Sequence, residues 1–212
     1  MKKITFILAT LVLLVSSCKK SEDQFPSKTK VVSSPTITLN GDPVVILNVG
    51  DSYTEQGATY YDSTYGDNGS ISSSTVVSTN QEGFFVITYN AVNQYGFTSS
   101  AVRLVAVTSA DDALDVSGDY ARVSNGYPVT VTKVGRGVFQ TGNAGGNGFE
   151  DPVYFMFTGD STMIMPEQFL INSGVPAGFV DPVYDFTASP PNYSYALDAS
   201  GYGSQLRVFE LQ

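Results

Sequence analysis

The residue types that carry out most enzyme chemistry are scarce in this chain. The sequence has no histidine and a single cysteine, Cys18. Without an imidazole there is no Ser-His-Asp triad and no histidine-bound metal. A glycosidase needs only two carboxylates, and acids are plentiful, but none form a recognisable pair at strand ends. We therefore expect a protein that is not an enzyme.

One pair of acids recurs in a repeated context. The residues FEDPVY at 149–154 return as FVDPVY at 179–184. A turn closed by Asp-Pro before a strand explains both copies. The alternative is that two equivalent strand starts place Asp151 and Asp181 on one rim, where their oxygens bind Ca²⁺. Calcium at this pair is the one cofactor that the sequence suggests.

Three tyrosines lie in stretches rich in Gly, Pro and Asn, which we interpret as loops. They are Tyr127, Tyr193 and Tyr202. Exposed loop tyrosines suit the recognition of sugars or peptides, whereas buried ones supply apolar area to a core. We expect at least one of the three to contact a ligand, and a purely structural role for all three is the alternative.

The cysteine follows a stretch typical of a bacterial leader. Lys2 and Lys3 precede an apolar run at 4–15, which is too short to span a bilayer. Small residues at 16–17 then precede Cys18, a pattern that resembles the lipoprotein lipobox. The resemblance implies that residues 1–17 are a signal peptide and that Cys18 carries the lipid anchor. An ordinary secretory leader with a chance cysteine is the alternative.

The segment after the cysteine is polar. We interpret residues 18–34 as the lipidated cysteine and a flexible tether. The residues KKSED at 19–23 partly resemble the signal that sends Bacteroidota lipoproteins to the outer face of the outer membrane. We therefore expect an outer-membrane lipoprotein exposed at the cell surface, with a plain spacer as the alternative reading of the segment.

The rest of the chain is strongly acidic. The formal net charge is −9, and from Val31 onward five basic residues stand against eighteen acidic ones. Counterion release at nucleic acid needs clustered Lys and Arg, so we exclude nucleic acid as a partner. A neutral glycan or a peptide is the expected ligand, because an anionic polymer is repelled.

The body is predicted to be all-β and to form two modules. The first module covers 35–108, where Phe85, Ile87, Tyr89 and Ala91 alternate with polar residues on one strand. A polar joint at 109–113 leads to the second module, 114–212, an antiparallel β-sandwich or an open barrel. Its expected strands are 119–123, 128–134, 137–141, 153–158, 162–165, 183–187, 193–197 and 205–211, with a helical turn allowed only at 166–172.

The first module resembles the small immunoglobulin-like domains of Bacteroidota surface proteins. The matching residues are Gly50-Asp51-Ser52-Tyr53, Gly57-Ala58, Asp62, the strand at 83–91, Gly96, Ser99-Ser100-Ala101 and Arg103-x-Val105-x-Val107. The resemblance implies an Ig-like β-sandwich that acts as a spacer or a binding platform. Asn93 departs from it, because the family often has Asp there, and this weakens a cation site at that position.

The second module is similar to part of the accessory lipoproteins of SusC/SusD-type importers. The matching residues are GDYAR at 118–122, Val129-x-Val131-x-Lys133-x-Gly135 and Gly137-Val138-Phe139. The resemblance implies a non-catalytic surface lipoprotein that helps to capture a glycan or peptide nutrient, with the transporter complex as partner. A structural or adhesive surface protein, with the Ig-like module as spacer, is the alternative, and an enzyme is the third class.

Overall fold

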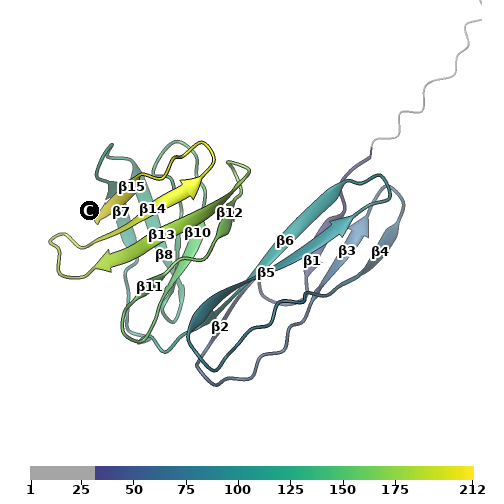
Figure 1. Ribbon diagram of the computed structural model, residues 1–212, viewed down its shortest axis with the longest axis horizontal. Helices are drawn as coiled ribbons and strands as arrows, with labels where there is room; N and C mark the ends of the chain where they lie inside the picture. Colours follow the sequence, from purple (N-terminus) through teal and green to yellow (C-terminus); the bar gives the residue numbers. More distant parts are fainter. Residues whose placement is uncertain (1–31) are drawn as a thin grey trace, which may run out of the picture. The chain divides into compact units, whose positions relative to one another are not determined.

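The computed structural model describes residues 32–212, which contain strands, turns and bends but no helix (Figure 1). The prediction of an all-β protein is confirmed. No helix in this part of the chain is long and apolar enough to cross a bilayer. The predicted signal peptide, Cys18 and the tether up to residue 31 lie outside the described residues, and the predictions for them stay predictions.

The first module is a sandwich of two three-stranded sheets. One sheet has the antiparallel order β1-β3-β4, and the other has the order β2-β6-β5, in which β2 runs parallel to β6. The strands are β1 (Thr36–Leu39), β2 (Val44–Leu47), β3 (Ala58–Asp62), β4 (Asp67–Ile71), β5 (Gly83–Val92) and β6 (Thr98–Val107).

The long β5–β6 hairpin follows from the alternation in the sequence. Ile87, Tyr89 and Ala91 are buried, while Thr88 and Asn90 face solvent. Successive side chains of a strand point to opposite faces, so the inward set packs against the facing sheet. The resulting core cluster is Ala58, Ile87, Tyr89 and Val105, with half-buried aliphatic and aromatic side chains around it.

The second module is one nine-stranded antiparallel sheet with the order β11-β10-β9-β8-β7-β15-β14-β13-β12. The sheet curls into an open half-barrel (Figure 1), and β11 approaches β13. The strands are β7 (Gly118–Arg122), β8 (Pro128–Gly135), β9 (Val138–Thr141), β10 (Val153–Phe157), β11 (Met163–Ile164), β12 (Gln168–Leu170), β13 (Val175–Asp185), β14 (Asn192–Ala199) and β15 (Leu206–Leu211). Of the two predicted alternatives, the open barrel is the one that forms.

Aromatic rings fill the interior of this curled sheet. Tyr193 stacks on Phe209 with ring centroids 4.7 Å apart, and Phe139 stacks on Phe155 at 5.5 Å. All four side chains are fully buried. Each aromatic side chain removes about 150–250 Å² from water, so a small sheet without disulfides obtains a sufficient core from these residues.

The sequence pattern missed one strand and shortened another. The helical turn allowed at 166–172 is wrong, because Gln168–Leu170 forms β12 and pairs with β13. The strand expected at 183–187 is longer and begins at Val175. The reason is that β12 lies at the sheet edge with Phe169 exposed, and its three residues are too few to show an alternation.

The two edges of the curled sheet approach each other along a line that we call the seam. One side chain bridges part of this seam. The side-chain amide of Gln168 in β12 accepts a hydrogen bond from the Tyr154 backbone N–H at 2.8 Å and donates one to the Tyr154 carbonyl at 2.8 Å. It thus replaces a neighbouring strand for a residue of β10. This bridge brings the turn after β12 close to the start of β10.

A small third cluster joins the two modules. Ala106, Val138 and Met156 are fully buried together, and half-buried aliphatic side chains pack around them. The Glu82 carboxylate accepts hydrogen bonds from the backbone N–H groups of Ser109 and Gly159 at 2.7 and 2.8 Å. Independent folding of 35–108 and 114–212 stays a prediction.

Candidate functional site

A buried carboxylate organises one end of the seam. Asp151 is 0 % exposed and stands just before β10. Its Oδ1 accepts hydrogen bonds from the N–H groups of Asn172 and Ser173, at 2.7 and 3.1 Å. Its Oδ2 accepts hydrogen bonds from the Ser173 hydroxyl and, at 3.0 Å, from the Tyr202 hydroxyl. The carboxylate therefore ties the start of β10 to the β12–β13 turn and to the loop after β14.

These hydrogen bonds set the charge of Asp151. Burial raises its pKa, but hydrogen bonds from Ser173, Asn172 and Tyr202 stabilise the ionised form and hold the pKa below the ordinary value of 3.8. All four lone-pair positions of the carboxylate have a donor. Asp151 is thus an ionised acceptor that fixes geometry, and its proton affinity is too low for a general base at neutral pH.

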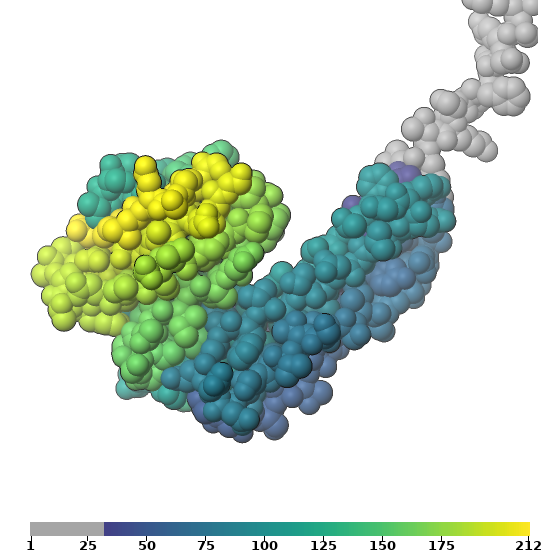
Figure 2. Space-filling view, in the orientation of Figure 1, coloured from purple at the N-terminus to yellow at the C-terminus, as the bar shows by residue number. Residues whose placement is uncertain are grey.

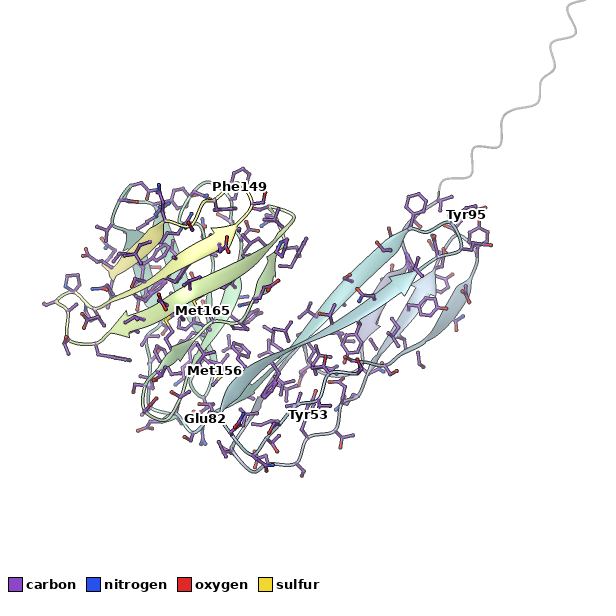
Figure 3. All side chains as sticks on the ribbon, viewed as in Figure 1. Tyr53, Glu82, Tyr95, Phe149, Met156 and Met165 are labelled. Carbon is purple, nitrogen blue, oxygen red and sulfur yellow. The ribbon has the colours of Figure 1, made fainter. Side chains whose placement is uncertain are left out.

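A shallow pocket of about 270 Å³ opens beside this network. Its walls combine two aromatic rings with two amides and two hydroxyls, and they come from the loop before β10, the β12–β13 turn and the loop after β14. The lining residues are Asn147, Phe149, Asn172, Ser173, Ser200, Gly201 and Tyr202. Phe149 is 59 % exposed and projects from the end of the module (Figure 3).

The loop at 143–148 packs behind the Tyr202 ring, which lines the pocket. The Gly145 carbonyl accepts hydrogen bonds from Arg122 Nη1 at 3.1 Å and from Arg207 Nε at 3.3 Å. A Cβ at Gly145 would lie only 2.6 Å from the Tyr202 ring, so a larger residue would displace that ring. The guanidinium of Arg207 lies over the same ring at 5.7 Å, a cation–π contact that fixes its orientation.

The structure separates the three tyrosines that the sequence grouped together. Tyr202 lines the pocket. Tyr127 is half-buried in the turn between β7 and β8, where its N–H donates to the Asn125 side chain at 3.0 Å, and it takes no part in the pocket. The expectation of Tyr193 as a loop residue is wrong, whereas the strand expected at 193–197 is confirmed by β14. Tyr193 lies in β14, is 0 % exposed and packs on Phe209, because it falls on the inward face of that strand.

The two acids of the sequence echo are not equivalent. Asp151 precedes a strand, but Asp181 lies inside β13, where it is exposed at a register shift with φ of 49°. The expectation of two equivalent strand starts is therefore wrong. Within 32–212, no three acidic, cysteine or histidine side chains cluster in a way that would hold a metal ion. Calcium binding by Asp151 and Asp181 stays a prediction from the sequence.

The sequence reasoning also missed most of the pocket. Phe149 belongs to the echo and Asn147 is its near neighbour in the chain, but Asn172, Ser173, Ser200 and Tyr202 come from two loops far along the chain, which only the curled sheet brings together. A signal for the supporting loop was present, since Gly145 and Gly146 are adjacent glycines between two strands. Both are buried, and Gly146 has φ of 53°.

A second polar network was missed in the first module. Arg103 is 1 % exposed and forms an ion pair with Glu55, while its Nη2 donates to the Asn40 carbonyl at 2.5 Å. Glu55 also accepts hydrogen bonds from the hydroxyls of Tyr53 and Tyr89. The signal in the sequence was that Arg103 is two residues from Val105, so a charged residue shares the inward face of the strand with an apolar one. The donors and acceptors of these side chains are used within the module, which favours a structural role.

The comparisons with known proteins identify the first module. A family model described as bacterial surface protein, Ig-like domain, matches residues 37–107. The first module is an Ig-like domain, similar to those of bacterial surface proteins. The match includes both sheets and the β5–β6 hairpin, and it ends at the last residue of β6, before the pocket-bearing module begins.

The search of curated proteins finds no match. Among solved structures, the chain is similar to the crystal structure of a lipoprotein from Bacteroides thetaiotaomicron. The two share 20 % sequence identity, the TM-score is 0.36, and the alignment covers 82 % of this chain and 97 % of that one.

Proposed function

We propose that this protein is a lipid-anchored surface lipoprotein of the outer membrane, without catalytic activity, that captures a neutral glycan or a peptide nutrient for a SusC/SusD-type importer. The observation that carries the binding part is the pocket around Phe149 and Tyr202. The Ig-like domain supports the location, because its family model is that of bacterial surface proteins.

The pocket supports a neutral, polar ligand with apolar faces. Phe149 and Tyr202 offer ring surfaces for stacking. The amides of Asn147 and Asn172 and the Ser200 hydroxyl offer both donors and acceptors beside them. No acidic or basic side chain lines the pocket. Sugars and peptide backbones need this combination, whereas an anionic polymer needs cations that the pocket walls lack.

The anchor is tested at the single cysteine. Cys18→Ala removes the only residue that can take a lipid by this route, so the variant should lose its acyl label and leave the membrane fraction. Metabolic labelling with a fatty acid and membrane fractionation measure this. Protease added to whole cells should degrade the wild-type body if the protein faces outward. A Cys18→Ala protein that still carries lipid would contradict the anchor.

The pocket is tested at Phe149, which is exposed and therefore replaceable without loss of fold. Phe149→Ala should weaken ligand binding by roughly 1–2 kcal/mol, because it removes one stacking surface. The probes are neutral gluco-, manno- and galacto-oligosaccharides and short peptides, with calorimetry as the readout. The melting temperature should stay within about 1–2 °C of wild type.

A matched control separates the pocket from general surface hydrophobicity. Phe169 in β12 is 56 % exposed and does not line the pocket, so Phe169→Ala should bind as wild type. If both variants bind alike, or if no probe binds the wild type, the pocket is not the site. In that case the structural or adhesive role becomes the better account of a surface protein with an Ig-like domain.

A further inference from the structure

One end of the first module carries a group of exposed aromatic side chains. We define the tip as the β5–β6 turn and the adjoining end of β3. It exposes Tyr61 to 52 %, Tyr95 to 55 % and Phe97 to 46 %. The Tyr95 ring lies 5.2 Å from the Tyr65 ring at this end (Figure 3). A group of aromatic side chains with this exposure indicates a surface that contacts a partner.

The chain enters the first module at the same tip. Asn93 is 9 % exposed and its side-chain oxygen accepts hydrogen bonds from the N–H groups of Tyr95 and Phe97, both at 3.0 Å. The same side chain donates from Nδ2 to the carbonyl of Ser33 at 2.9 Å. One residue therefore shapes the aromatic turn and fastens it to the first residues of the module. Figure 2 shows the teal turn segment beside the purple start of the described body.

The length of the chain between Cys18 and this tip limits their separation. A chain running from Cys18 to Ser33 reaches at most roughly 50 Å even when fully extended. A lipid on Cys18 thus keeps the tip within that distance of the membrane. No lysine or arginine occurs between Lys30 and Arg103, so the tip itself has no cation to pair with lipid phosphate, and the lysines nearest to it in the sequence are Lys28 and Lys30. Tyrosine and phenylalanine side chains are suited to the headgroup layer, where one end is apolar and the other is hydrated.

We propose that the tip of the first module is a membrane-contact surface, with Tyr61, Tyr95 and Phe97 inserted in the headgroup layer next to the anchor. This inference rests on the anchored location of the proposed function but not on its ligand. The contact depends on aromatic burial, so it forms on zwitterionic lipid. It weakens on anionic lipid at low salt because the acidic body is repelled.

The absence of tryptophan from the chain allows a direct test. Phe97→Trp places a single fluorophore at the tip, and Phe169→Trp places one at a site of similar exposure in the second module. The full chain is coupled through Cys18, its only cysteine, to a maleimide phospholipid in phosphatidylcholine vesicles. Attachment then does not depend on natural lipidation, so failure of the lipidation prediction cannot hide the result.

Brominated acyl chains should quench the tip tryptophan at least about twofold more than the control, and its emission should shift to shorter wavelength. Vesicles rich in phosphatidylserine at low salt should reduce the difference. If Phe97→Trp lowers the melting temperature, Tyr95→Trp replaces it. Equal quenching at the tip and at position 169, or full access of acrylamide to the tip tryptophan on vesicles, would overturn the proposal.

Discussion

The two modules bury polar groups in opposite ways. The first module places one ion pair, Arg103 with Glu55, between its sheets and surrounds it with tyrosine hydroxyls. The second module places the carboxylate of Asp151 at the end of the seam, and its buried Arg207 donates hydrogen bonds to the backbone carbonyls of Gly145, Gln205 and Tyr202. Apart from the Tyr65–Tyr95 pair, the aromatic ring pairs between described residues lie in the second module.

The difference shows where a binding site can arise. In the first module the charged network joins two sheets, and its donors and acceptors are used within the protein. In the second module the ionised group fixes three loops around Ser173 and Tyr202, and other side chains of those loops remain open to the pocket. The buried ion pair thus stabilises the sandwich of the first module, whereas the buried carboxylate of the second module positions the loops around the pocket.

The largest effect is expected from breaking the ion pair of the first module. Arg103→Met leaves the Glu55 carboxylate without its cation and the Asn40 carbonyl without its donor. Loss of one partner of a buried pair costs about 3–5 kcal/mol. Urea unfolding followed by circular dichroism measures this loss, with amide signals of the first module as a local readout.

A double variant separates charge from packing. Glu55→Gln in the Arg103→Met background removes the orphaned charge and should recover part of the loss. A loss below about 1 kcal/mol for the single variant would show that Glu55 is satisfied by Tyr53, Tyr89 and water, and that the ion pair does not hold the two sheets together.

A smaller effect is expected at the rim of the second module. Asp151→Asn keeps one acceptor oxygen but loses the charge that four donors share, so we expect a loss of roughly 2–3 kcal/mol at neutral pH. Asp181→Asn is the matched control. Asp181 is exposed, and asparagine tolerates its positive φ, so the change should be within about 0.5 kcal/mol. Thermal unfolding of both variants decides between a rim-forming and an incidental carboxylate.

The pH dependence sharpens the same comparison. The pKa of Asp151 is lowered on folding from 3.8, so its contribution is complete above about pH 4 and is lost as the pH falls through the lowered value. The melting temperature of wild type should therefore fall more steeply below pH 4 than that of Asp151→Asn. If the melting temperatures of the two proteins fall equally below pH 4, the carboxylate adds nothing to stability at the rim.

The all-β class and the Ig-like first module with its long hairpin could be predicted from the sequence alone. Alternation at Ile87, Tyr89 and Ala91 is a local property, because a strand repeats every two residues and each face has one environment. It also predicted the strands from β7 to β10. The alternation of apolar and polar residues was sufficient to predict a strand wherever one face of that strand is buried.

The curl of the second sheet and the site on its rim depend on contacts between distant parts of the chain. β12 is too short to carry a pattern, and Gln168 acts as a strand neighbour through its side chain, which no periodicity predicts. Tyr193 and Tyr202 both follow turn-forming residues, yet one faces the core and the other the pocket. The pairing register of β14 and the closure of the seam made that choice, since both depend on residues far apart in the chain.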